Sequence, residues 1–311
     1  MRNFEEISDH VRIGLALSGG GARGLAQVGV LKVLEREGIP VHLVTGTSIG
    51  AVMGGLYACC ADAAMTEARV LETVASTGMQ ALDLNKILEL SNVTPVAGDA
   101  PPAGGWIASA QKLVRRVYAS HAALTKQAVI ESEQILGVFE ELFGECTFEQ
   151  ARIPFAAVAV DIEEGCEVII AKGRIARAVA ASSAIAGIFP PVEIGGRSLV
   201  DGGYTSPVPI EAARTLGANV VIGIDVSTGA IDRGGLENAV EVAMRANEIT
   251  LIALEREQLR RADVVVPARG QERHWSDYSA PGEAIAAGER AAEQMLPSIR
   301  AAIEERARLF V

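Results

Sequence analysis

Histidine, cysteine and aromatic residues are scarce in this sequence of 311 residues. There are four histidines and four cysteines, and Phe, Trp and Tyr together make up 4% of the chain. No two cysteines have the Cys-x-x-Cys spacing of a zinc or redox motif, so we expect buried free thiols rather than disulfides or a zinc site. The acidic residues and histidines show no metal-ligand spacing, and we expect neither a metal nor a cofactor.

Positively charged residues are also fewer than negatively charged ones. With 28 Lys and Arg against 39 Asp and Glu, the net charge is −11 at pH 7, and we expect no nucleic-acid partner. Residues 1–10 lack the apolar core of a secretory signal, which predicts a cytoplasmic location. The apolar stretch at residues 41–64 contains four glycines and several polar side chains. It therefore favours a buried strand, turn and helix over a transmembrane span.

The sequence does contain a regular alternation of strand-like and helix-like segments. Hydrophobic residues make up 49% of the chain and charged residues 22%, and we expect one domain over residues 1–311. Residues 11–60 read twice as strand, glycine turn and helix, with the apolar strands of a parallel sheet covered on both faces. This predicts an α/β fold with three layers, α/β/α, around a mainly parallel sheet. Further strands are predicted at 154–162, 167–170, 219–226 and 263–266, and further helices at 131–143, 207–216, 235–261 and from about 282 onward.

The alternation is interrupted between about residues 61 and 150. This segment combines helices with a Pro- and Gly-rich loop at 94–105, and it is predicted to be a helical cap inserted into the domain. The core that carries the motifs then covers about residues 11–226, and C-terminal helices occupy about residues 235–311.

A candidate nucleophile lies where the second strand turns into a helix. Residues 46–50 read Gly-Thr-Ser-Ile-Gly, the G-x-S-x-G pattern of a nucleophile elbow. The flanking glycines permit a sharp turn that lifts the Ser48 hydroxyl above the sheet, where a carbonyl carbon can approach. The pattern indicates a hydrolase or acyltransferase, provided that a base and an oxyanion site accompany it, because the pentapeptide alone is a weak signal.

A glycine-rich turn follows the first strand. Residues 18–24 read Ser-Gly-Gly-Gly-Ala-Arg-Gly and lead into a helix, so their backbone amides form an anion site. The anion could be a pyrophosphate or a transient oxyanion, and a turn that only allows close packing is the third interpretation. Dinucleotide binding requires an acidic residue at the end of the next strand, and the elbow stands there instead.

Two candidates could supply the base. Of the histidines, His10, His42 and His121 are poorly placed, and only His274 follows the candidate acids in Ser-Asp-His order. Asp201 begins an Asp-Gly-Gly turn at the end of a strand, a pattern that also suits an ordinary tight turn. Local sequence does not decide between these candidates.

The three motifs, taken in order, resemble those of the patatin-like phospholipase family. That family has G-G-G-x-R/K-G, then G-x-S-x-G, then D-G-A/G, and residues 19–24, 46–50 and 201–203 match each in turn. The resemblance runs from about residue 11 to residue 226 and includes residues 181–184 and 189–192. It departs from the family at Ala186, where other members often have proline.

The resemblance implies a role for each motif residue. Ser48 would be the nucleophile and Asp201 its only partner in a Ser-Asp dyad. The amides of Gly20 and Gly21 would form the oxyanion hole, with Gly19 and Arg23 supporting that loop. The implied activity is hydrolysis of fatty-acyl esters of phospholipids, lysophospholipids or related lipids; an acyltransferase and a regulatory lipid-binding protein are the alternatives.

Residues 106–118, within the expected cap, are predicted to form an amphipathic helix. Its polar face carries Lys112, Arg115 and Arg116, and Trp106 stands at its start. Two interpretations remain open: a cap helix that covers the acyl pocket, or a helix that docks on a lipid surface and brings the protein to the membrane periphery.

Overall fold

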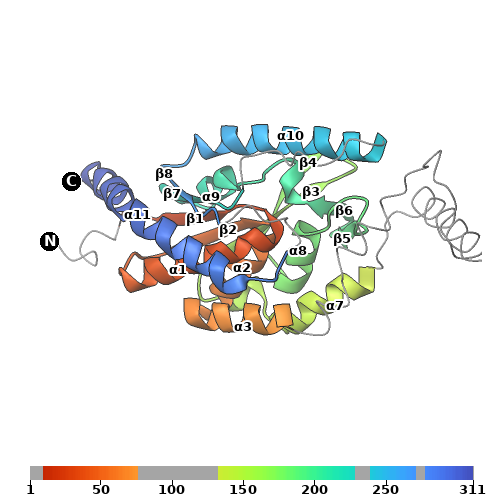
Figure 1. Ribbon diagram of the computed structural model, residues 1–311, viewed down its shortest axis with the longest axis horizontal. Coiled ribbons are helices and arrows are strands. Elements are labelled where there is room, and N and C mark those ends of the chain that lie inside the picture. The colour runs from red at the N-terminus through yellow and green to blue at the C-terminus, as the bar shows by residue number, and fades with distance from the viewer. Residues whose placement is uncertain (1–9, 76–131, 228–238, 271–276, 311) are drawn as a thin grey trace, which may run out of the picture.

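A computed structural model describes residues 10–75, 132–227, 239–270 and 277–310 of the chain. In these residues eight strands form one sheet between helical layers (Figure 1). The strands are β1 (Ile13–Leu17), β2 (Leu43–Thr47), β3 (Phe155–Asp161), β4 (Cys166–Ile170), β5 (Val192–Ile194), β6 (Arg197–Asp201), β7 (Val220–Asp225) and β8 (Val264–Pro267). The α-helices are α1 (Ala26–Arg36), α2 (Ile49–Cys60), α3 (Ala63–Ala75), α7 (Ser132–Phe143), α8 (Ile175–Ser182), α9 (Ile210–Thr215), α10 (Ala239–Leu259) and α11 (Pro281–Arg308).

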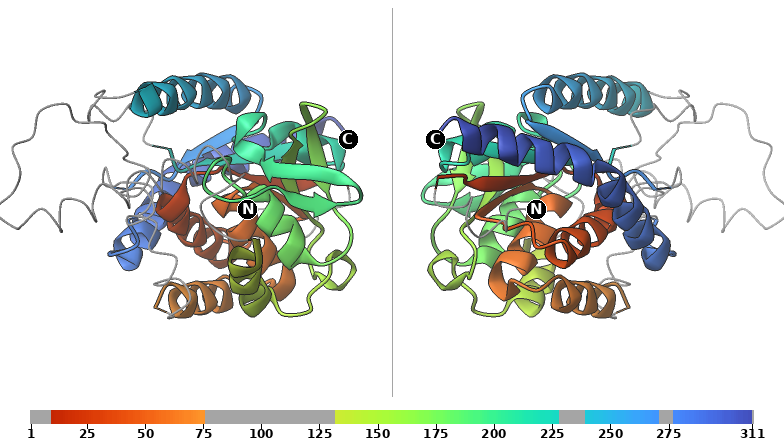
Figure 2. Two further views of the ribbon diagram at one scale, coloured as in Figure 1. Left: turned by 90° about the vertical axis from the view of Figure 1, so that its right-hand side faces the viewer. Right: turned by 90° about the vertical axis from the view of Figure 1, so that its left-hand side faces the viewer.

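The central strands are parallel, as the sequence predicts. They follow the order β3-β2-β1-β7-β8, whereas β4, β5 and β6 join in antiparallel pairings at the β3 side. Figures 1 and 2 show α1 and α2 on one face of the sheet and α9 and α10 on the other, which confirms the three layers. The sequence analysis did not predict β5, which has only three residues, or α8.

The alternation of side chains along β1 explains how two helical layers fit on one strand. Ile13, Leu15 and Leu17 belong to the main core, together with residues of α1, α2 and α11. Ala16 points to the opposite face and packs in a smaller cluster with residues of α9. Gly14 shares that face, where a β-carbon would lie 2.7 Å from the β-carbon of Ala218. Large side chains therefore fill one face, and small residues let α9 approach the other.

Strand β3 determines how the strands at this side of the sheet are arranged, because two strands share one of its edges. Strand β4 pairs with residues 157–161 of β3, and this range overlaps the pairings of both β2 and β6. Since a strand has only two edges, β2 and β6 must follow one another along the edge that β4 leaves open. In the register, Thr47 pairs with Val158, and Asp201 pairs with the next residue, Ala159. The carboxyl ends of β2 and β6 therefore meet head to head.

The described parts of the segment 61–150 pack on the core. Helix α3 contacts α1 and α2, and α7 contacts α8. The Pro- and Gly-rich loop at 94–105 and the amphipathic segment 106–118 lie outside the described residues, so the cap and its boundaries remain predictions. Over the part of the chain that the structure describes, no helix combines the length and the apolar character needed to cross a membrane.

Candidate active site

Ser48 occupies a strained turn between β2 and α2. Its backbone angles are φ 56° and ψ −124°, in a region that side-chain-bearing residues rarely adopt. The glycines on both sides make the turn possible. A β-carbon at Gly46 would overlap the backbone of Gly50, and one at Gly50 would overlap the carbonyl group of Leu17. The sharp strand-to-helix turn that the G-x-S-x-G pattern predicts is thus present.

A second serine, to which sequence reasoning gave no role, fixes this turn to the sheet. The backbone N–H of Ser48 donates to Oγ of Ser182 at 2.9 Å, and that hydroxyl donates to the carbonyl of Val158 at 2.6 Å. Ser182 is fully buried at the end of α8. Helix α8, the nucleophile turn and β3 are therefore joined by one hydroxyl, and the Ser48 amide is already occupied.

Asp201 lies at the carboxyl end of β6, directly opposite this turn. Only 7% of its surface is exposed, and its Oδ1 accepts a hydrogen bond from the Gly203 N–H at 2.7 Å. Burial raises the pKa of Asp201 to about 6, while hydrogen bonds from the Gly203 amide and the Ser48 side chain act in the opposite direction. The carboxyl group thus lies within hydrogen-bonding reach of the Ser48 hydroxyl, as a proton acceptor must.

The segment after Asp201 is held in place from two sides. Oγ1 of Thr47 donates to the Ser206 carbonyl at 2.7 Å, and Oγ1 of Thr45 donates to the Pro209 carbonyl at 3.0 Å. From α10, Gln258 donates to the Thr205 carbonyl at 2.9 Å and accepts from the Val208 N–H at 3.0 Å. Strand β2 therefore leads into the Ser48 turn, and its threonines also anchor the loop that follows Asp201. These contacts join residues far apart in the chain, and no local pattern indicates them.

The glycine-rich turn runs beside the serine. A β-carbon at Gly19 would lie 3.5 Å from the β-carbon of Ser48. The Gly19 N–H donates to the Pro207 carbonyl at 3.0 Å, so it holds the loop rather than offering a donor. Gly20 and Gly21 have positive φ angles of 150° and 59° and open the short 3-10 helix Gly21–Leu25. Their amides make no hydrogen bond to an acceptor in the described residues, as expected for the start of a helix without a side-chain cap.

Arg23 links this turn to a buried charge cluster. Its Nε donates to the Gly20 carbonyl at 3.1 Å. Burial lowers the pKa of Arg23, against the opposing charges of Glu255, Glu248 and Asp225. Burial and the charge of Asp225 in turn raise the pKa of Glu255. The cluster thus places negative charge near the guanidinium that holds the Gly20 carbonyl, and sequence reasoning missed it.

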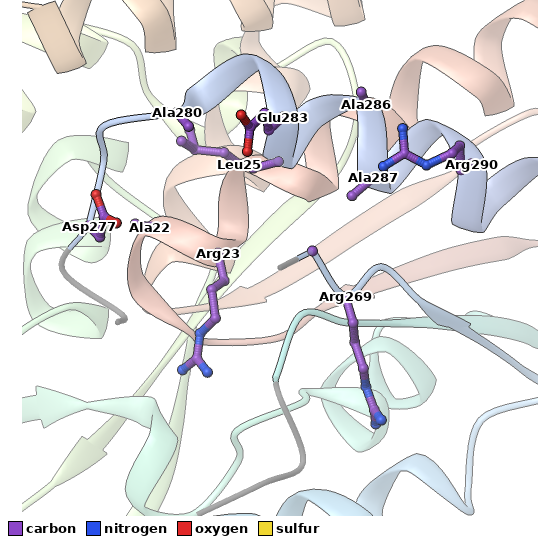
Figure 3. A pocket seen from close by; sticks show the side chains of 12 residues that line it. Ala22, Arg23, Leu25, Arg269, Asp277, Ala280, Glu283, Ala286, Ala287 and Arg290 are labelled. Carbon is purple, nitrogen blue, oxygen red and sulfur yellow. The ribbon is translucent and has the colours of Figure 1, made fainter. Parts of the chain in front are cut away.

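Asp225, fully buried at the end of β7, forms the other half of this cluster. Its Oδ2 accepts from Arg269 Nη2 at 2.5 Å, and its Oδ1 accepts from the hydroxyl of Ser227 at 2.8 Å. A cavity of about 240 Å³ adjoins both arginines and α11 (Figure 3). Neither Ser48 nor Asp201 lines this cavity.

The two described histidines lie far from Ser48. Nδ1 of His42 accepts from the Ile13 N–H at 3.0 Å at the amino end of β2, and Ser48 follows its carboxyl end, roughly 20 Å away at the rise of a strand. Burial and the charge of Arg12 lower the pKa of His42. His10 packs against Phe310, with ring centroids 5.5 Å apart. His121 and His274 lie outside the described residues, so the rival base at His274 is not tested.

The departure from the family pattern at Ala186 has a local explanation. The Ala186 N–H donates to the Tyr204 hydroxyl at 3.2 Å, and a proline at this position has no N–H to donate. Burial and the charge of Asp201 raise the pKa of Tyr204. In this chain the hydrogen bond from the Ala186 N–H to the Tyr204 hydroxyl connects the loop after α8 to the segment after Asp201, at a position where the family often has proline.

Comparison with known proteins shows the family to which the chain belongs. Residues 15–214 match the family model described as patatin-like phospholipase. This range contains the glycine-rich turn, Ser48 and Asp201. The chain belongs to the patatin-like phospholipase family.

Among the relatives, "Lysophospholipase nte1" from Emericella nidulans is 35% identical over 221 residues, 71% of this chain and 12% of that protein. "Patatin-like phospholipase domain-containing protein ZK370.4" from Caenorhabditis elegans is 35% identical over 218 residues, 70% of this chain and 14% of that protein. An uncharacterised NTE family protein from Mycobacterium bovis is 29% identical over 233 residues, 75% of this chain and 53% of that protein. The chain thus spans between an eighth and about half of these relatives.

Among solved structures, VipD from Legionella pneumophila shares 16% identity and a TM-score of 0.48, covering 93% of this chain and 67% of VipD. A similarity this distant does not bear on the site.

The junction of β2 and β6 predicts different effects for two adjacent glycines. A β-carbon at Gly202 would overlap the Val158 carbonyl oxygen, whereas one at Gly203 would lie 3.1 Å from Asp201 Oδ1. We expect Gly202→Ala to displace Asp201 and abolish hydrolysis of a p-nitrophenyl ester, and Gly203→Ala to retain most of it. The measurement is kcat/KM of both folded variants beside the wild type. Equal losses in the two variants would contradict the head-to-head arrangement.

Proposed function

We propose that the chain is a serine acyl hydrolase that cleaves fatty-acyl ester bonds of phospholipids, lysophospholipids or related lipids. The observation that supports this most is that the carboxyl ends of β2 and β6 meet, so that the buried carboxyl group of Asp201 lies opposite the turn that contains Ser48. Membership of the patatin-like phospholipase family and the lysophospholipase names of relatives favour a lipid ester as substrate.

In the proposed first step, Oγ of Ser48 attacks the acyl carbonyl carbon while Asp201 accepts its proton. The carbonyl oxygen gains the negative charge and is stabilised by the amides of Gly20 and Gly21. The tetrahedral intermediate then collapses, the ester C–O bond breaks, and Asp201 returns the proton to the departing alcohol. The products are an acyl group on Ser48 and a free alcohol or lysolipid.

In the second step water replaces the lipid alcohol. Asp201 accepts a proton from the water as it attacks the acyl-enzyme, the same amides bind the oxyanion, and Ser48 leaves as a hydroxyl. The fatty acid is released and the dyad is restored. Loss of one oxyanion donor in such a site typically costs about 10²- to 10³-fold in turnover, so the exact path of the glycine turn matters as much as the dyad.

The main alternative is an acyltransferase that passes the Ser48 acyl group to an acceptor other than water. A regulatory lipid-binding protein is the second alternative. The combination of serine, aspartate and the glycine amides disfavours it, because binding alone requires none of these. Incubation with a mixed lipid extract followed by mass spectrometry separates the three. A hydrolase releases free fatty acids, a transferase forms new acyl esters, and a binding protein changes neither.

The identity of the base is tested by three substitutions. We expect Ser48→Ala and Asp201→Asn each to lower kcat/KM for a p-nitrophenyl ester by several orders of magnitude, because one removes the nucleophile and the other the proton acceptor at nearly unchanged volume. We expect His274→Ala to retain most of the activity. A folded His274→Ala variant as inactive as Ser48→Ala would replace the dyad by a Ser-Asp-His triad.

The raised pKa of Asp201 predicts an acid limb in the pH profile. Only the ionised carboxylate accepts a proton, so kcat/KM should fall about tenfold per pH unit below a midpoint near 6. A midpoint near the usual carboxyl value of about 4 would contradict the effect of burial. A histidine base would titrate at about 6.5, so this profile measures the environment of Asp201 and leaves the choice of base to the substitutions.

We propose that the segment 106–118 contacts lipid, either as the cover of the acyl pocket or as a helix docked on a membrane surface. Changing Trp106 to Ala together with Lys112, Arg115 and Arg116 to Gln separates the two. Docking predicts weaker co-sedimentation with anionic liposomes and nearly unchanged hydrolysis of a soluble ester. The cap interpretation predicts altered ester hydrolysis with unchanged co-sedimentation.

A further inference from the structure

Two cysteines that the proposed mechanism does not use face each other away from the catalytic turn. The sulfurs of Cys59 and Cys146 are 2.6 Å apart, although 87 residues separate them in the chain. Cys59 lies in the last turn of α2, and Cys146 follows α7. Both side chains are half-buried, so small solutes can reach the pair.

Hydrogen bonds that do not involve the sulfur atoms hold the backbone near Cys59 and near Cys146. The Cys146 carbonyl accepts from the Ile175 N–H at 3.1 Å. At the end of α2, the Ala58 carbonyl accepts from the Arg152 N–H at 2.8 Å, and the Cys60 carbonyl accepts from Arg152 Nη1 at 3.2 Å. The segment that follows Cys146 is therefore tied to the helix that carries Cys59. The two sulfurs are brought together by the fold and need no bond between them to stay there.

We propose that Cys59 and Cys146 are a disulfide-forming pair that closes the base of the inserted segment. The bond would enclose residues 60–145, almost the whole insertion between the α2 and β3 parts of the core. In the structure both cysteines are free thiols, as expected from the sequence, and the proposal adds an oxidised state that no motif in the sequence indicates. In a reducing compartment such a bond would form transiently, on exposure to an oxidant.

Hydrogen peroxide can serve as the oxidant. The Cys146 sulfur attacks one peroxide oxygen, the O–O bond breaks, and a sulfenic acid and one water form. The Cys59 sulfur then attacks the Cys146 sulfur, the S–O bond breaks, and the hydroxyl leaves with the Cys59 proton as a second water. The two thiols lose two electrons and the peroxide gains them. Cys146 is the attacking group because burial and the hydrogen bond with Cys146 raise the pKa of the Cys59 thiol and disfavour its thiolate.

The bond should change stability and leave the catalytic turn in place. Cys59 lies eleven residues after Ser48, roughly 16 Å along the helix at its usual rise. Closing a long loop removes conformational freedom from the unfolded chain, so the oxidised protein should melt roughly 5–10 °C higher than the reduced one. The inference therefore does not depend on the proposed function.

The chain offers a matched control in Cys60, which is adjacent to Cys59 in the same helix and is buried. We would reduce the full chain, remove the reductant, add stoichiometric hydrogen peroxide, unfold the protein in denaturant so that buried thiols react, block the remaining thiols with maleimide and map the peptides by mass spectrometry. Wild type and Cys60→Ala should both give the linked peptides of Cys59 and Cys146. Maleimide should label Cys166 in both proteins and Cys60 in the wild type. Cys59→Ala and Cys146→Ala should give no linked peptide.

Dithiothreitol should remove the link and return the melting temperature to that of the reduced protein, with ester hydrolysis equal in the two forms. Labelling of all four cysteines after peroxide, or a link that involves Cys60 or Cys166, would overturn the proposal. A Cys59–Cys146 link without a rise in melting temperature would overturn the structural role assigned to it. Absence of esterase activity in both forms would count against the proposed function alone.

Discussion

The sharing of one edge of β3 by β2 and β6 is the constraint on which the candidate active site depends. Because β2 runs parallel to β3 and β6 runs antiparallel, their carboxyl ends point at each other. The register leaves no residue of β3 between them, since Thr47 pairs with Val158 and Asp201 with Ala159. A serine after one strand and an aspartate at the end of the other are brought together by main-chain pairing alone.

Several contacts around the junction keep it from relaxing. The positive φ of Ser48 is a conformation that must be stabilised by its surroundings, and the Ser182 hydroxyl supplies part of that stabilisation through its bonds to the Ser48 amide and the Val158 carbonyl. On the other side, Thr47 and Gln258 hold the loop after Asp201. In the same loop, the Pro207 carbonyl accepts a hydrogen bond from the Gly19 N–H. The segments that contain Ser48, Asp201 and the glycine turn are thus linked by hydrogen bonds to backbone groups.

Much of this could be predicted from the sequence where the physical requirement is local. The glycines at 46 and 50 are needed within the turn that contains Ser48, and the apolar strands of 13–17 and 43–47 follow from burial on both faces. The role of Ser182 could not be predicted, because its partners lie 134 and 24 residues away. The cluster of the buried Asp225 and Glu255 with the exposed Arg269 was missed for the same reason, although a carboxylate at the end of an apolar strand was a visible signal. The extent of the cap still rests on sequence alone, because residues 76–131 lie outside the described structure.

Burial of Asp201 sets the pH at which its carboxyl group ionises. A carboxyl group with a pKa of about 6 is ionised at neutral pH and remains a stronger base than an exposed carboxylate. The most direct test of its role is the rate at which an organophosphonate modifies Ser48, followed by mass spectrometry from pH 4 to pH 8 in the wild type and in Asp201→Asn. A dyad predicts a wild-type rate that rises with a midpoint near 6, and a very slow, nearly pH-independent rate in the variant. An unchanged rate and midpoint in Asp201→Asn would show that another group takes the proton from Ser48.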